Sequence, residues 1–74
     1  MKIKELRNHI ENLISDLEFS YDGVDGSICP INRNEIYLSY GHNNYDARSV
    51  DEAMKIPFIA GQALENIGEK LEFY

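Results

Sequence analysis

The spacing of apolar residues changes twice along this chain of 74 residues, and the change limits how it can fold. Apolar residues first recur every three or four positions, the period of an amphipathic helix. Between Glu18 and Tyr40 they alternate with polar residues, as in a strand with one buried face. After Ser49 the helical period returns. The pattern predicts a helix, then strands, then two further helices.

The first helix is predicted over Ile3 to Leu17. Its apolar stripe has six members at steps of three or four residues: Ile3, Leu6, Ile10, Leu13, Ile14 and Leu17. A coiled coil would show a similar stripe, but barely two heptads are present. We therefore expect a helix that packs on a sheet.

Three or four short strands are predicted to follow. Phe19 and Tyr21 alternate with polar residues, and Asp22-Gly23 and Asp25-Gly26 are turn signals. A second strand is expected over 27–31. Pro30 favours a sheet edge or the end of this strand, because proline has no backbone donor.

The strongest strand pattern is Glu35 to Tyr40, which follows a polar turn at 32–34. Its apolar side chains Ile36 and Leu38 point to the same side as Tyr40, and its other side chains point away. A turn over 41–44 and a last short strand over 45–48 complete the predicted meander.

The final third of the chain begins with a strong helix-start signal. Ser49 and Glu52 have the spacing of a capping box, in which each side chain accepts a hydrogen bond from the other residue's backbone amide. Pro57 ends this helix, since it disfavours helical geometry at the residue before it. A second helix is predicted from Gln62 or Ala63 to about Leu71.

In that second helix Gly68 is an unfavourable residue, and we expect it to allow close approach to another backbone. The whole pattern predicts one domain, residues 1–74, of the α+β class. We expect an N-terminal helix, a small antiparallel meander of three or four strands, and two short C-terminal helices on one face of the sheet.

The formal net charge of −6 restricts the classes of partner. Proteins that bind nucleic acid by neutralising phosphates are usually basic, and anionic membranes repel an acidic chain. An acidic chain suits a basic protein partner. The single cysteine allows no internal disulfide, so a homodimer is one way for so small a core to gain stability. With no predicted signal peptide or membrane span, we expect a cytoplasmic protein.

Two sets of residues resemble chemical sites, and we assign neither. Asp22, Asp25 and Ser27 resemble the opening of a calcium loop, but the late bidentate glutamate is missing. Cys29, His42 and Asp46 are residue types used in thiol catalysis, yet their spacing does not bring them together. We expect no metal, no cofactor and no enzymatic activity.

Two groups are candidate interface residues. The tyrosines Tyr37, Tyr40 and Tyr45 are typical interface anchors, or alternatively ordinary strand residues, and Tyr45 is expected to join Tyr37 across the turn. The second group makes the C-terminal helices acidic: Asp51, Glu52, Glu65 and Glu69. These carboxylates either form a solvated face or meet a basic partner.

The stretch SVDEAMKIPFIAGQALENIGEKLEFY resembles the C-terminal part of short uncharacterised proteins of Gram-positive bacteria and their prophages. The matching residues are Ser49, Asp51, Met54, Phe58, Gly61, Leu64 and Ile67. Gln62 and Ala63 stand where that pattern has lysine and serine. The resemblance implies a fold and a phage or prophage origin, and it implies no catalytic residues.

The functional expectation is a small cytoplasmic protein that binds another protein. One alternative is an acidic inhibitor that imitates nucleic acid in the groove of a basic host protein. Another is a small-ligand or enzymatic site in the cleft of a dimer.

Overall fold

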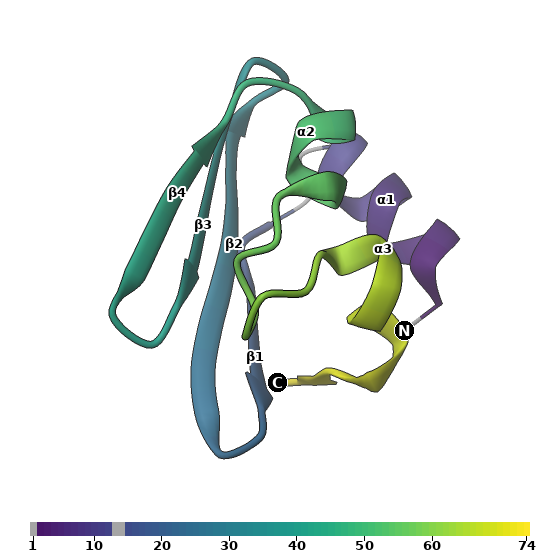
Figure 1. Ribbon diagram of the computed structural model, residues 1–74. Coiled ribbons are helices and arrows are strands. Elements are labelled where there is room, and N and C mark those ends of the chain that lie inside the picture. The colour runs from purple at the N-terminus through teal and green to yellow at the C-terminus, as the bar shows by residue number, and fades with distance from the viewer. Residues whose placement is uncertain (1, 13–14) are drawn as a thin grey trace.

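Helices cover one face of a five-stranded antiparallel sheet and leave the other face bare (Figure 1). This computed structural model describes residues 2–12 and 15–74. The helical elements are α1 (Ile3–Glu11), α2 (Val50–Lys55), α3 (Leu64–Ile67) and the 3-10 helix η1 (Gly68–Lys70). The strands are β1 (Leu17–Tyr21), β2 (Val24–Asn32), β3 (Glu35–Tyr40), β4 (Asn43–Ala47) and β5 (Glu72–Phe73).

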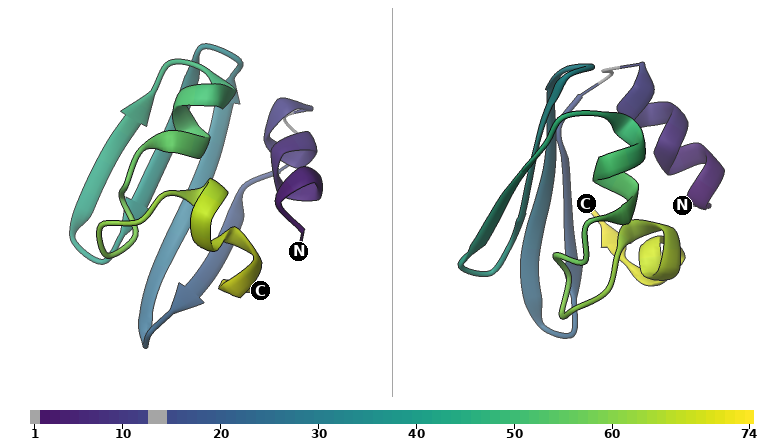
Figure 2. Two further views of the ribbon diagram at one scale, coloured as in Figure 1. Left: turned by 45° about the vertical axis from the view of Figure 1, so that its right-hand side comes forward. Right: turned by 45° about the horizontal axis from the view of Figure 1, so that its top comes forward.

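The predicted α+β architecture is confirmed, with five strands rather than three or four. The strands lie in the order β4-β3-β2-β1-β5. The first four form the expected meander, and the C-terminal residues add β5 beside β1. Figure 2 shows from two further directions that all helices lie on the same side of the sheet.

Helix α1 is shorter than predicted. It ends at Glu11, and the side-chain amide of Asn12 donates to the carbonyl of Asn8 at 2.8 Å just past that end. Leu17 was assigned to the helical stripe but opens β1, where it is buried on the same face as Phe19. Its position fits both the helical period of the first stripe and the alternation of the following strand, so the spacing alone assigned it to the wrong element. Leu13 and Ile14 lie outside the described residues.

One of the two predicted Asp-Gly turns is correct. Asp22 and Gly23 have φ of 53° and 78°, the two positive values that a type I′ hairpin turn needs. The second prediction is wrong, because 25–26 lies inside β2. Gly26 is required there for a different reason. A β-carbon at this position would lie 2.4 Å from Cζ of Phe19 and 2.6 Å from the carbonyl oxygen of Ser39.

Pro30 occupies a local edge, although β2 is the central strand. The N–H of Gly41 donates to the carbonyl of Asp25 at 2.9 Å, so odd-numbered residues of β2 bond to β3. Even-numbered residues, including Pro30, face β1. Strand β1 does not extend beside Pro30, because β1 begins at Leu17 and Leu17 pairs with Ile28. The donor that proline lacks is not needed.

Strand β3 has the predicted bounds, whereas β4 begins two residues earlier than expected. The turn between them holds only Gly41 and His42, because Tyr40 pairs directly with Asn43. The positive φ of Gly41, 60°, allows this tight connection. The predicted turn over 41–44 was too long.

The start of α2 is as predicted, but only the Ser49 half of the predicted capping box is present. The Ser49 hydroxyl accepts the N–H of Glu52 at 3.0 Å, and the helix stops at Lys55, two residues before Pro57. The next helix was predicted too long. Helix α3 begins at Leu64, and from Gly68 the chain continues as η1. The predicted close approach of Gly68 to another backbone is wrong, because a β-carbon there would meet the side chains of Ile3 and Leu6 in α1.

The core lies between the two layers and is centred on Phe19, which is fully buried. Its ring stacks with Tyr40 at a centroid distance of 6.4 Å. It also meets Phe58 edge-on at 6.4 Å and Phe73 at 5.9 Å. These rings come from β1, β3, the connection after α2, and β5. The second layer is therefore fixed to the sheet, and every strand keeps a defined inner and outer side.

Candidate protein-binding surface

The candidate surface is the sheet face turned away from the helices, which we call the outer face. Side chains alternate along each strand, and directly paired residues of antiparallel strands share a side. The strand pairings and the burial pattern therefore define its members: Glu18, Ser20, Asp25, Ser27, Cys29, Glu35, Tyr37, Ser39, Asn44, Asp46, Glu72 and Tyr74.

Acidic charge is concentrated on this face. Its members include five carboxylates and neither lysine nor arginine: Glu18, Asp25, Glu35, Asp46 and Glu72. Residues 16–48 and 72–74 together hold seven of the 13 acidic residues but only two of the seven basic ones, Arg33 and Arg48. The remaining segments hold six acidic and five basic residues. The sheet layer therefore carries most of the net charge.

The acidic residues predicted on the helices are exposed, and several act within the fold. Asp51 pairs with Arg7 and joins α2 to α1. This hydrogen bond and the positive charge of Arg7 lower the pKa of Asp51. The carboxylate of Glu69 accepts the N–H of Ile3 at 3.5 Å, at the start of α1. Two of the four predicted carboxylates thus hold helical segments together.

The three predicted tyrosines do not form one cluster. Tyr37 lies on the outer face with 42% of its surface exposed. Its hydroxyl donates to Glu35 at 2.9 Å, and this hydrogen bond raises the pKa of Tyr37. Tyr40 lies in the core with 8% exposed and donates to the carbonyl of Tyr21 at 2.7 Å. Tyr40 is therefore not part of an exposed surface.

The expectation that Tyr45 joins Tyr37 is wrong. Tyr45 pairs with Leu38, whereas Tyr37 pairs with Asp46. Tyr45 is therefore on the helix side of the sheet, and it is 42% exposed because it lies on the edge strand β4. A shift of one residue reverses the side to which a strand residue points, so this register decides the outcome.

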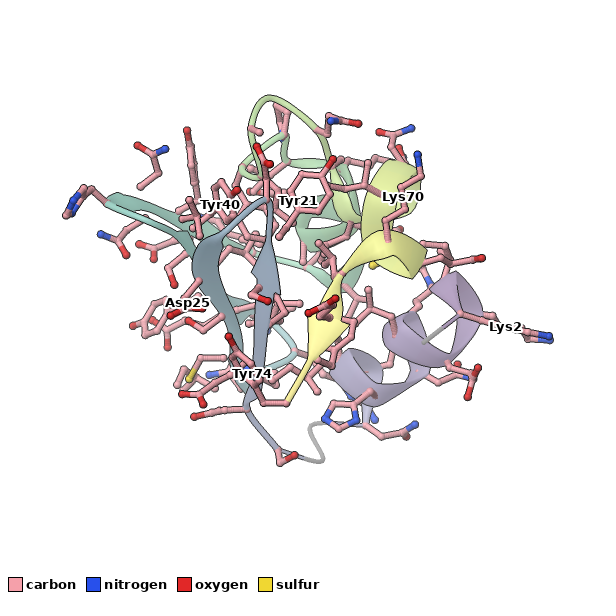
Figure 3. The ribbon with its side chains drawn as sticks, turned by 90° about the horizontal axis from the view of Figure 1, so that it is seen from below. Lys2, Tyr21, Asp25, Tyr40, Lys70 and Tyr74 are labelled. Atoms are coloured by element: carbon pink, nitrogen blue, oxygen red, sulfur yellow. The ribbon has the colours of Figure 1, made fainter. Side chains whose placement is uncertain are left out.

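Sequence reasoning missed Tyr74. Its N–H donates to the carbonyl of Glu18 at 3.0 Å, and its hydroxyl donates to Oδ1 of Asp25 at 2.7 Å (Figure 3). This second bond raises the pKa of Tyr74. The ring lies beside β1 on the outer face and is 76% exposed. The outer face thus has two exposed tyrosines, each bonded to a carboxylate.

Between these tyrosines the surface is polar and slightly hollow. The hydroxyls of Ser27 and Ser39 are 2.7 Å apart across β2 and β3. A shallow depression of about 360 Å³ lies beside them and is lined in part by Tyr37, Asn44 and Asp46. Its polar, open form suits contact with protein side chains better than enclosure of a small molecule.

The residues considered for thiol catalysis are not brought together. Cys29 and Asp46 lie on either side of Tyr37, two strands apart. His42 is in the hairpin turn, four residues from Asp46 and about 13 Å away along the strand. Hydrogen bonding to Asp16 raises the pKa of the Cys29 thiol, which disfavours the reactive thiolate.

Within residues 2–12 and 15–74, no group of three or more histidine, cysteine, aspartate or glutamate side chains has a geometry that could hold a metal ion. Asp22 lies in the first hairpin turn, and Asp25 and Ser27 lie on β2. Among the helices of the described segments, none has the length and apolar character required to cross a membrane.

The chain matches no protein-family model, no curated protein and no solved structure in the comparisons. The resemblance of residues 49–74 to bacterial and prophage proteins therefore stays a prediction.

Proposed function

We propose that this chain is a non-enzymatic binding domain whose outer face docks on a surface of another protein rich in lysine and arginine. The observation that carries the proposal is the distribution of charge. Five carboxylates lie on the bare side of the sheet, while acidic and basic residues nearly balance elsewhere. Arg33 and Arg48 lie at one end of this face, where they line a hollow with Glu35 and Asp46.

A face of this kind favours fast and selective association. Its charge attracts a basic partner over about one Debye length, near 8 Å at physiological ionic strength, and repels acidic surfaces. Tyr37 and Tyr74 supply exposed rings that desolvate on contact, and such rings are frequent binding hot spots. Their hydroxyls orient Glu35 and Asp25, so part of the charge is already positioned.

The same charge distribution supports the alternative of nucleic-acid imitation, in which the basic partner surface is a groove that ordinarily holds DNA or RNA. Both functions place cations against the outer face. They differ in what competes for the partner, because only a nucleic-acid groove is blocked by a DNA or RNA duplex.

The test is capture of partners from a bacterial lysate by two variants of equal charge. Glu18→Gln with Asp46→Asn removes two outer-face carboxylates, and Glu11→Gln with Glu65→Gln removes two exposed carboxylates from the helices. Both change the net charge from −6 to −4. We expect the outer-face pair to lose at least about tenfold in captured partner, the equivalent of about 1.4 kcal/mol, while the helix pair captures as the wild type does.

Equal capture by both variants, or no specific partner for the wild type, would contradict the proposal. Raising the salt concentration should release the partner, since screening weakens attraction between exposed charges. Displacement by duplex DNA would assign the nucleic-acid groove, and retention in its presence would assign an ordinary protein surface.

A further inference from the structure

The free edge of β4 is an interaction surface distinct from the outer face. Strand β4 is the last in the order β4-β3-β2-β1-β5, and Figure 1 shows its outer side free of other described segments. At the other edge, β5 is only two residues long. The two ends of the sheet therefore differ in how much unpaired backbone they offer.

The backbone groups that β4 presents can be assigned from one hydrogen bond. Gly41 donates to Asp25 of β2, so the odd-numbered residues of β3 bond to β2 and the even-numbered ones bond to β4. Through the pairing of Leu38 with Tyr45, the odd-numbered residues of β4 face β3. Asn44 and Asp46 therefore direct their N–H and C=O groups away from the sheet.

This edge has little of the usual protection against pairing, since Asp46 is its one charged residue. Natural edge strands carry proline, lysine, a bulge or an inward charge that blocks addition of another strand. The segment Asn43–Ala47 contains neither proline nor lysine, and its pairing with β3 has no register shift. Its free groups are spaced as a regular strand requires.

We propose that a second copy of this chain pairs with this edge, β4 against β4, with a twofold axis at Tyr45. Antiparallel pairing about Tyr45 places Asn44 of each copy opposite Asp46 of the other. All four outward N–H groups then meet outward carbonyls, giving four hydrogen bonds. A register shifted by two residues toward the C-terminal end of β4 would instead place Asp46 against itself, and like charges in direct opposition are unfavourable.

Tyr45 fits the centre of this pairing. Its ring is 42% exposed, on the helix side of the sheet. At the axis the two tyrosines form a non-hydrogen-bonded pair. In such pairs the Cα atoms are about 4.5 Å apart and the side chains are closest. Each ring covers the other, and the two outer faces become one continuous ten-stranded surface.

The dimer is expected to be weak. Stable interfaces typically bury about 1,200–2,000 Å² of surface, and a contact limited to one short strand and one tyrosine ring from each copy is small by comparison. We therefore expect a Kd on the order of 100 µM. Each copy carries a net charge of −6, so salt should strengthen this association by screening the repulsion. Partner binding at the outer face has the opposite salt dependence.

Sedimentation equilibrium of the purified chain from 10 µM to 1 mM in 0.5 M NaCl tests the pairing. The average molecular mass of the wild type should rise with concentration from the 8.5 kDa of one chain toward twice that value. Tyr45→Lys should stay monomeric, while Tyr37→Lys should associate like the wild type. Both tyrosines are 42% exposed on neighbouring strands, so the two variants match in charge and exposure.

A wild type that stays monomeric at 1 mM would overturn the proposal, as would equal loss in both variants. If circular dichroism shows Tyr45→Lys unfolded, a synthetic chain with an N-methyl group on the Asn44 amide replaces it. This amide faces away from β3, so the monomer fold is retained and the association should be lost. Unchanged association of that chain would exclude the β4 edge. Neither result depends on whether the outer face binds a basic partner.

Discussion

Replacing Phe19 with alanine should lower the free energy of unfolding by about 3–5 kcal/mol, the range for a fully buried phenylalanine. The ring is completely buried and packs against Tyr40, Phe58 and Phe73. Its loss would leave a cavity bordered by three separate segments. A domain of this length has a total stability of about 4–11 kcal/mol, so the substitution removes a large part of it.

Urea unfolding followed by circular dichroism measures this loss. Phe73→Ala is the matched control, because its half-buried ring lies at the margin of the same cluster. We expect the control to lose less than half as much stability, about 1–2 kcal/mol. Similar losses in both variants would show that Phe19 is not the centre of the core.

Gly26→Ala should cost about 3 kcal/mol, although it adds only one methyl group, because an overfilled position forces its neighbours to move. The added carbon would meet the Phe19 ring at 2.4 Å and the carbonyl oxygen of Ser39 at 2.6 Å. That oxygen belongs to the central hairpin, so the backbone cannot move without disturbing the pairing of β2 with β3.

The same substitution at Gly68 is the control. There the new carbon would meet Cδ1 of Ile3 at 2.8 Å and Cδ2 of Leu6 at 3.0 Å, which are the ends of flexible side chains. Gly68 also has helical φ and ψ of −54° and −33°, so alanine is locally favoured. We expect a change within about 1 kcal/mol. A larger loss at Gly68 than at Gly26, measured by urea unfolding, would contradict this packing.

The sequence predicts those elements whose signals are local. The alternation over Glu35–Tyr40 and the cap at Ser49 each depend on a few neighbouring residues, and both are confirmed. Gly26 was misread because Asp-Gly is a common turn signal, and the ring that requires glycine belongs to another strand. Strand β5 was missed because two residues show no alternation, and its pairing with β1 spans most of the chain.

The candidate surface could be predicted only in part. The alternation in β3 correctly places Tyr37 opposite the buried side chains. The outer-face carboxylates come from separate strands, and their common side depends on hairpin registers that composition does not reveal. The helical carboxylates fall in two short stretches of the sequence and are therefore easier to see, but Asp51 and Glu69 contact α1.

We propose that the outer face, rather than the helices, is the electrostatic docking surface. The most direct measurement is a ¹H–¹⁵N NMR titration of the chain with an octalysine peptide at low salt. We predict that the largest shift changes occur at outer-face residues such as Glu18, Tyr37 and Asp46. Largest changes at Glu52 and Glu65 of α2 and α3, or changes spread evenly over both layers, would contradict the claim.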